Sequence, residues 1–147
     1  MADERLRVTV DDAYTRALGL ACFTFARLEW DAYWCCEKIK PGELQALLTA
    51  PRPSTAGTVS STLVRLAHTL PPSPRTTLIQ ECAADFSAIV KNVRNPLIHG
   101  KPGTAANGDQ RLFQPNSSPW TIADVNRSSD EFTALQIRLN ELVLSFP

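Results

Sequence analysis

DDAYTRALGLACFTFARLEWDAYWCCEKIK, the stretch from residue 11 to residue 40, decides the fold of this chain. Its apolar residues fall within about 40° of one line when drawn at about 100° per residue, and they are Tyr14, Leu18, Ala21, Phe25, Leu28, Ala32, Cys36 and Ile39. Asp11 and Asp12 are typical of a helix start, and Pro41-Gly42 is typical of a stop. The pattern predicts a helix of about 30 residues and about 45 Å, which favours an elongated bundle.

The opposite side of this helix is also partly apolar, because Phe23, Trp30 and Trp34 cluster there with Leu20 nearby. A helix that is apolar on two sides is packed on both or touches a second partner. Two interpretations stay open. The aromatic side either packs within the chain under a loop or hairpin, or forms a homodimer interface, since exposed aromatic patches usually mark contacts.

Weaker helical patterns follow along the chain. A short helix is expected around residues 43–48, and a second principal helix over residues 59–70. A third begins at Ser73-Pro74, where serine is a good N-cap and proline is tolerated at the first helical position. Its apolar stripe is Leu78, Cys82, Phe86, Ile89 and Val93.

The chain after Gly100 is rich in Gly, Pro, Asn and Ser. Residues 110–114 and 120–125 are compatible with two short strands joined through residues 115–119. Ser128 and Glu131 have the spacing of a capping box, which predicts the start of a last helix there.

Together these elements predict an all-α fold for residues 1–147 as a single domain. The expected architecture is an elongated helical bundle of four to five helices, with a short β-hairpin before the last helix. A chain of 147 residues suits one domain. Its 44% hydrophobic and 20% charged residues are ordinary for a globular protein.

Charge and cysteine content narrow the classes of function. The formal net charge is zero, with 15 basic and 15 acidic side chains, so any site for a polyanion must be local. The cysteines lack metal-ligand spacing, so we expect no metal and no other cofactor; Cys22 and Cys36 are expected to be buried free thiols. Residues 1–5 are charged and lead into no apolar run, and no segment is long enough to span a bilayer, which indicates a cytoplasmic chain without a membrane segment.

Residues 91–101, KNVRNPLIHGK, concentrate polar side chains where the third helix ends. Asn95 precedes a proline, which disfavours the helical region, and Pro96 itself lacks a backbone donor. We therefore expect the regular helix to end or kink near Arg94. In an unbroken helix Arg94 and His99 would lie about 140° apart around the axis. They could then act on one small group only through a break, or through a second copy of the segment from another subunit.

The same segment is locally basic. Between residues 88 and 123 the basic residues are Lys91, Arg94, Lys101 and Arg111, and the acidic one is Asp109. This balance suits a phosphate-bearing ligand, because arginine binds phosphate in a bidentate manner and lysine supplies a point charge.

Structural roles are the alternative for both motif residues. His99 could act as a helix C-terminal cation that satisfies backbone carbonyls. Arg94 could pair across the bundle with Glu81, Asp85 or Glu29.

Two stretches resemble a known family. Arg94-Asn95-x-x-x-His99 resembles the R-x(4–6)-H motif of HEPN domains, in which a polar residue commonly follows the arginine. Residues 25–29, FARLE, resemble the aromatic-x-x-Leu-Glu phrase of the first helix in many such proteins. The order of predicted helices resembles the family over most of the chain. The resemblance in amino-acid identity is confined to these two stretches.

The resemblance implies a metal-independent endoribonuclease of toxin–antitoxin, phage-defence or RNA-processing systems. It implies a homodimer in which two motifs face each other across a shared cleft. His99 would be the general acid/base, Arg94 would stabilise charge on the phosphate, and Asn95 would orient the site or contact RNA. Glu29 would be the helix-borne acid that holds the arginine or histidine, while Lys91 and Lys101 become expected RNA contacts.

Elementary chemistry agrees with those roles. Attack by a ribose 2′-hydroxyl on its own phosphodiester needs a base near neutral pH and a cation at the phosphorane, which histidine and arginine supply. The products would be a 2′,3′-cyclic phosphate and a 5′-hydroxyl. Two other interpretations stay open: a noncatalytic HEPN-like module binding nucleotide, RNA or a protein partner such as a cognate antitoxin, and a bundle whose motif match is accidental. The family interpretation requires Arg94 and His99 to be at least partly exposed in a cleft.

Overall fold

The computed structural model describes residues 9–49, 51 and 54–147. In this part of the chain the predicted helical bundle and the hairpin before its last helix are confirmed. The elements, in chain order, are α1 Asp12–Ile39, α2 Glu43–Thr49, α3 Ala56–Ala67, α4 Pro74–Ile89, a π-helical turn at Val90–Arg94, α5 Asn95–Ile98, β1 Lys101–Thr104, β2 Gln110–Phe113 and α6 Ile122–Leu144. Residues 1–5, on which the expectation of no secretory leader rests, lie outside the described part.

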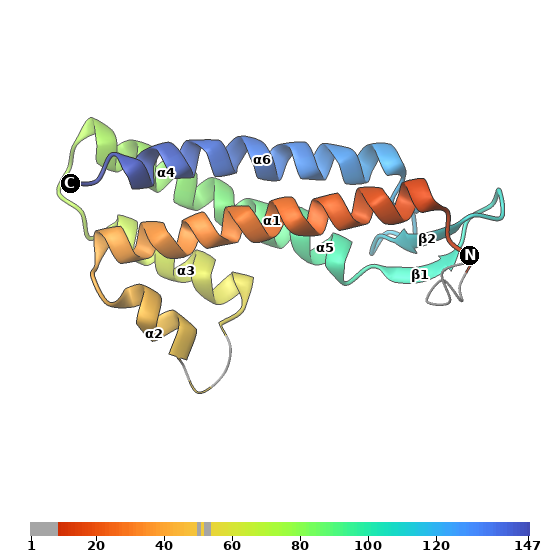
Figure 1. Cartoon of the computed structure of the whole chain (residues 1–147), viewed down its shortest axis with the longest axis horizontal. Helices are drawn as coiled ribbons and strands as arrows, with labels where there is room; N and C mark the ends of the chain where they lie inside the picture. The colour runs from red at the N-terminus through yellow and green to blue at the C-terminus, as the bar shows by residue number, and fades with distance from the viewer. Residues whose placement is uncertain (1–8, 50, 52–53) are drawn as a thin grey trace, which may run out of the picture.

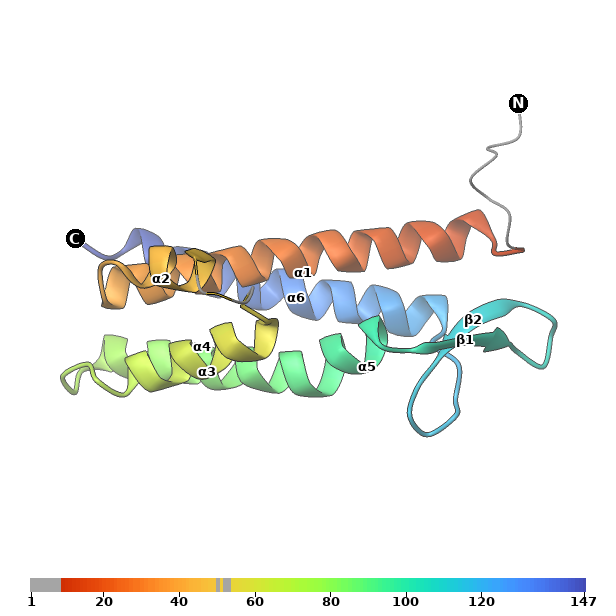
Figure 2. The ribbon, with the colours of Figure 1, turned by 90° about the horizontal axis from the view of Figure 1, so that it is seen from below.

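The bundle is elongated, and its long helices lie along one common axis, with α4 running opposite to α1 and α6 (Figure 1). Seen from below, α1 and α6 form one layer, while α3 and the continuous line from α4 to α5 form the other (Figure 2). The hairpin lies at the end of the bundle where α1 and α6 begin. Two contacts hold it there: Arg111 forms an ion pair with Asp11 at 2.7 Å, and the Tyr14 hydroxyl accepts from the Leu112 amide at 3.1 Å. None of the described helices is long and apolar enough to cross a membrane.

Helix α1 begins and ends where its sequence predicts. The Asp11 carboxylate accepts from the Tyr14 amide at 2.8 Å, which satisfies one of the free amides of the first turn. At the other end the Glu37 carboxylate accepts from the amides of Gly42 and Leu44, and Gly42 adopts a left-handed φ of 94°. The expectation of a buried thiol is confirmed for Cys36 and wrong for Cys22, which is exposed beside the apolar stripe rather than within it.

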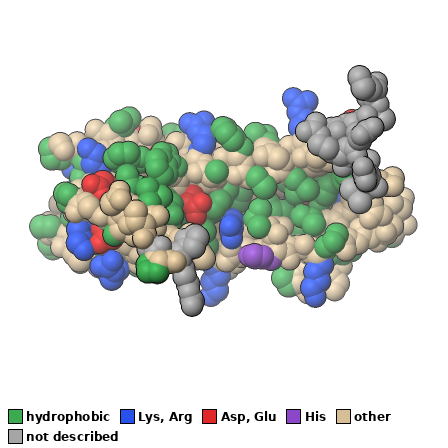
Figure 3. Space-filling view, turned by 60° about the horizontal axis from the view of Figure 1, so that its bottom comes forward, with side chains coloured by type: hydrophobic (Ala, Val, Ile, Leu, Met, Phe, Trp, Pro, Cys, Tyr) green, Lys and Arg blue, Asp and Glu red, His purple; other side chains and the backbone are tan. Residues whose placement is uncertain are grey.

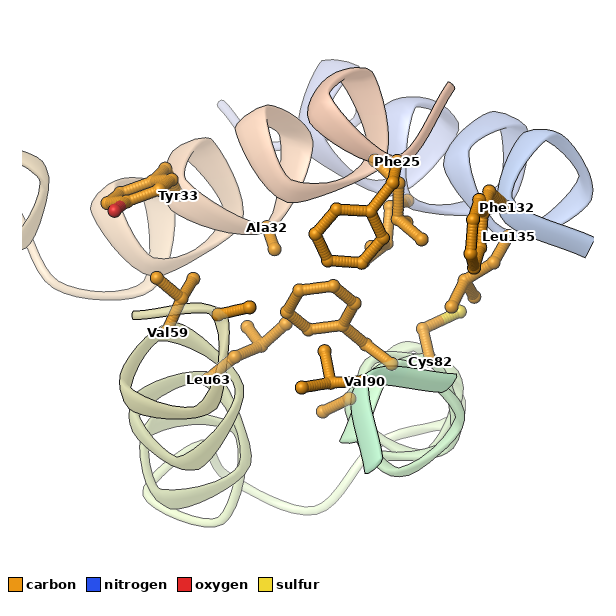
Figure 4. Close-up of a cluster of buried hydrophobic side chains, with 14 of the residues drawn as sticks. Phe25, Ala32, Tyr33, Val59, Leu63, Cys82, Val90, Phe132 and Leu135 are labelled. Carbon is orange, nitrogen blue, oxygen red and sulfur yellow. The ribbon is translucent and has the colours of Figure 1, made fainter. Parts of the chain in front are cut away.

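The core is organised around Phe25 of α1 (Figure 4). Its ring stacks on Phe86 of α4 at a centroid distance of 6.3 Å and meets Phe132 of α6 edge-on at 5.2 Å. Aromatic pairs of this kind contribute about 0.5–1.5 kcal/mol beyond the area they bury. Val59 and Leu63 of α3, both fully buried, close the other side of the cluster. These contacts fix α1 against the helix that carries the Arg94 motif.

The predicted second strand and the predicted start of the last helix are both wrong. β2 pairs with β1, with Lys101 opposite Phe113, and residues 120–125 instead lead into α6. The cause is an earlier capping box, in which the Thr121 hydroxyl accepts from the Asp124 amide and the Asp124 carboxylate accepts from the Thr121 amide. Ser128 is therefore inside the helix, where its hydroxyl donates to the Asp124 carbonyl.

The aromatic side of α1 is exposed. Phe23, Trp30 and Trp34 retain 63%, 46% and 38% of their accessible surface, and Leu20 is exposed beside them. Among the described residues no loop or hairpin covers this side, so the interpretation of packing within the chain does not hold there.

Candidate functional site

The regular α-helix α4 ends at Ile89, near the predicted position, but the chain stays helical through Asn95 and Pro96, contrary to the expectation that Asn95 leaves the helical region. Asn95 has helical torsion angles, φ −64° and ψ −46°, and its amide donates to the Val90 carbonyl, five residues earlier. This wider π-helical turn lets the chain reach Pro96 in the first turn of α5, where a missing backbone donor is tolerated. The ladder then returns to α-helical spacing, because the His99 amide donates to the Asn95 carbonyl at 2.9 Å.

His99 caps this helix and lies in the wall of an open cavity of about 740 Å³. One wall is the end of the motif helix and the other is the hairpin with its following loop. The lining residues are Lys91, Asn95, Pro96, His99, Lys101, Pro102, Gly103, Phe113, Gln114, Pro115 and Ser117. The structure therefore brings together Lys91, Asn95, His99 and Lys101, as expected for a shared site.

The lining contains cationic and amide side chains but no Asp or Glu. Figure 3 shows a histidine on this face of the molecule with Lys and Arg side chains around it. Low-dielectric walls with charges of one sign concentrate a local field, so the cavity favours an anionic ligand although the chain is neutral. The family interpretation requires both Arg94 and His99 to be at least partly exposed in a cleft. His99 meets this condition, whereas Arg94 is half-buried and is not among the residues that line the cavity.

Arg94 and Glu29 do not line this cavity. The Arg94 guanidinium lies over the Phe25 ring, 5.4 Å from its centroid, at a distance typical of a cation–π contact. Glu29 is half-buried on α1, and burial raises the pKa of its carboxyl, while the positive charge of Arg94 opposes that rise. The alternative pairing of Arg94 with Asp85 is not found, since Asp85 binds Arg138 at 2.7 Å.

One hydrogen bond links Arg94 to the cavity. Its Nη1 donates to Oδ1 of Asn95 at 2.8 Å. A guanidinium can only donate, so this contact requires the amide oxygen to face Arg94 and leaves the Asn95 amide nitrogen as the free end. Asn95 is thus shared between the half-buried arginine and the cavity wall.

The hairpin wall depends on two glycines. A Cβ at Gly100 would meet the Leu112 Cβ at 3.0 Å and the Leu97 carbonyl at 3.1 Å, so the turn out of α5 needs glycine. A Cβ at Gly103 would lie 3.0 Å from the Phe113 ring, which covers that glycine. The sequence indicated a hairpin but paired residues 110–114 with residues 120–125 instead of with β1. It therefore did not predict that Phe113, Gln114, Pro115 and Ser117 line the cavity.

In residues 9–49, 51 and 54–147 no three His, Cys, Asp or Glu side chains gather closely enough to hold a metal ion. No protein-family profile, curated protein or solved structure matches this chain.

Proposed function

We propose that this chain is a metal-independent endoribonuclease of the HEPN type, acting in the cytoplasm as a toxin or phage-defence effector. The observation that supports this function is the cavity in which His99 lies with Lys91, Lys101 and Asn95, without an acidic side chain. Such a lining suits a phosphodiester, whose charge the lysines complement while the imidazole stands beside it.

The reaction needs one base, one acid and charge stabilisation. His99 accepts the proton of the ribose 2′-hydroxyl as that oxygen attacks the adjacent phosphorus. The imidazolium then gives a proton to the departing 5′-oxygen. The P–O5′ bond breaks, and the products are a 2′,3′-cyclic phosphate and a 5′-hydroxyl. Lys91, Lys101 and the free amide of Asn95 stabilise the charge of the phosphorane.

In this proposal Arg94 is a positioning residue rather than a phosphate contact. Its hydrogen bond occupies Oδ1 of Asn95 and leaves the amide nitrogen of this cavity residue for a ligand, while the guanidinium lies over the Phe25 ring. Glu29 adds negative charge near Arg94 and so favours that placement. A phosphate contact by Arg94 would instead require the cleft of a second chain.

Homodimerisation is part of the proposal, and the exposed side of α1 supports it. Leu20, Phe23, Arg27, Trp30 and Trp34 follow the alternating three- and four-residue spacing of a coiled-coil seam, which fits another helix. Sedimentation of the wild type against Trp30→Glu tests it: a wild-type dimer that becomes a monomer supports this face. A wild type that stays monomeric at high concentration contradicts dimerisation.

A second candidate function, noncatalytic binding of nucleotide, RNA or a protein partner such as a cognate antitoxin, is supported by the same cationic lining. The two are separated by incubating total RNA in EDTA with the wild type, His99→Ala and His68→Ala. His68 is an exposed histidine at the end of α3 and serves as the matched control. Cleavage to 2′,3′-cyclic phosphate ends that only His99→Ala abolishes supports the ribonuclease. RNA binding without cleavage supports the second candidate.

A further inference from the structure

We infer that the hairpin wall of the cavity is a nucleobase subsite, so the substrate is single-stranded RNA with one unpaired base inserted against Phe113. This inference rests on the proposed function for the identity of the chain that enters, and it adds how the site selects it. The two walls differ in chemistry: the helix wall carries Lys91, Asn95 and His99, while the hairpin and its loop carry Phe113, Pro115 and Gln114 together with Lys101.

The Phe113 ring is held in place before any ligand arrives. It covers Gly103 closely, since a Cβ there would lie 3.0 and 3.2 Å from two ring carbons. The backbone of Phe113 pairs with Lys101 on one side and bridges to Pro119 on the other. A fixed aromatic ring in a cavity wall is a stacking platform, and every base has a face that can use it.

The register places the platform next to a cation. Residues directly opposite in an antiparallel pair carry their side chains on the same face, so Lys101 and Phe113 share one face of the hairpin. A base stacked on Phe113 therefore has its own phosphate within the reach of Lys101 and near His99. Gln114, with one amide donor group and one acceptor, can read a base edge at the same place.

Such a subsite excludes paired strands. In a duplex both faces of each base are covered by its neighbours, whereas an unpaired base can leave the stack and enter a pocket. The cavity volume of about 740 Å³ leaves room for a base with its ribose and phosphate. The ligand class is thus a single strand, and cleavage further selects ribose because the 2′-hydroxyl is the nucleophile.

The experiment measures binding of a fluorescein-labelled 12-nucleotide RNA by polarisation in EDTA. Its 2′-hydroxyls are replaced by fluorine so that the strand is not cleaved, and each position in turn is made abasic. Proteins are the wild type, Phe113→Leu, Phe113→Tyr and, as the matched control at the other end of the bundle, Phe146→Leu. We expect Phe113→Leu and one abasic position each to weaken binding about tenfold. Combined, they should weaken it no further. Phe113→Tyr, which keeps an aromatic face, should recover most of the binding that Phe113→Leu loses, and Phe146→Leu should bind like the wild type. The duplex of the same sequence should bind weakly.

The subsite would be overturned if strands with and without a base bound equally well at every position. It would also be overturned if Phe113→Leu weakened the binding of the single strand and of the duplex by the same factor. The abasic series uses the wild type alone, so it decides the matter even if Phe113→Leu does not fold. Coupling between Phe113 and one base in a wild type that never cleaves RNA would overturn the ribonuclease and keep the subsite. Cleavage of RNA without coupling between Phe113 and any base would overturn the subsite and keep the ribonuclease.

Discussion

Nη1 of Arg94 lies 2.8 Å from Oδ1 of Asn95, so the two polar residues of the motif bind each other instead of facing one ligand side by side. The arginine is half-buried over Phe25 and the asparagine lies in the cavity wall. This division sets the order of action from the core outward. Phe25 holds Arg94 and Arg94 binds Asn95, and under the proposed function Asn95 would meet the ligand beside His99.

The first prediction concerns the Asn95 amide nitrogen. Asn95→Asp keeps an oxygen for Arg94 but replaces the donor with a negative charge inside the cavity. We expect kcat/KM for RNA cleavage to fall by at least about 100-fold, the loss typical of removing a donor to a charged transition state, while unfolding in urea changes little. The matched control is Asn92→Asp, an exposed position of the same π-helical turn outside the cavity. Near wild-type cleavage by Asn95→Asp would contradict this role.

Complementation between two inactive chains decides how Arg94 acts. Arg94→Ala and His99→Ala are co-expressed with different tags, and the mixed dimer is purified through both. If Arg94 works through Asn95 of its own chain, neither half of the mixed dimer has a complete site and cleavage stays absent. If Arg94 serves the partner's His99 across a shared cleft, one complete site forms. Recovery of about half the wild-type rate would therefore overturn the positioning role.

The carboxyl of Glu29 gives a pH-dependent prediction. Burial raises its pKa in the folded state, so folding favours the protonated form, and this contribution is lost as the pH rises through the raised value. Glutamine does not ionise, so Glu29→Gln does not lose stability in this way as the pH rises. The free energy of unfolding of Glu29→Gln minus that of the wild type should therefore increase from about pH 4 to about pH 7.

Urea unfolding across that pH range measures the difference. In an Arg94→Gln background the opposing positive charge is gone, so the increase with pH should be larger. A variant that becomes less stable than the wild type at neutral pH would instead indicate that Glu29 and Arg94 form a net stabilising pair.

Thiol reactivity follows from burial. Desolvation raises the pKa of Cys35 and of Cys36 to about 12, and it also raises the pKa of Cys82. The reactive species is the thiolate, so these three buried side chains should resist a maleimide at pH 7.5, whereas the exposed Cys22 should react. We expect one modified thiol in the native chain, none in Cys22→Ser, and all four in urea. Two or more rapid modifications in the native chain would contradict the packing of α1, which carries Cys35 and Cys36, or of α4, which carries Cys82.

The fold was predictable where the pattern was local. The apolar residues from Tyr14 to Ile39 recur at helical spacing and were predicted to face one core. The observed burial of Ala21, Phe25, Leu28 and Ala32 agrees with this prediction. The site was predictable in part for the same reason, since Lys91, Asn95 and His99 are close in sequence and remain on one helix end.

Two features depended on distant contacts and were missed. Pro96 predicted a break, but the burial of Val90 and Leu97 in the core holds the chain helical on both sides of it, and a π-helical turn absorbs the misfit. Phe113 entered the site only through the pairing of β2 with β1. That register is set across a loop, and no local pattern reports it.

The buried indole of Trp120 donates through Nε1 to the Pro96 carbonyl at 3.3 Å, and its amide donates to the Leu112 carbonyl at 2.8 Å. Trp120 therefore anchors the motif helix through its side chain and the hairpin through its backbone, next to the start of α6. Apart from Lys101 on β1, the groups assigned to bond breaking lie on the helix, and those assigned to choosing a base lie on β2 and the loop that follows it. Under these proposals, substitutions confined to residues 110–117 would change which base is bound. The helical bundle and the cleavage groups that it carries would stay the same.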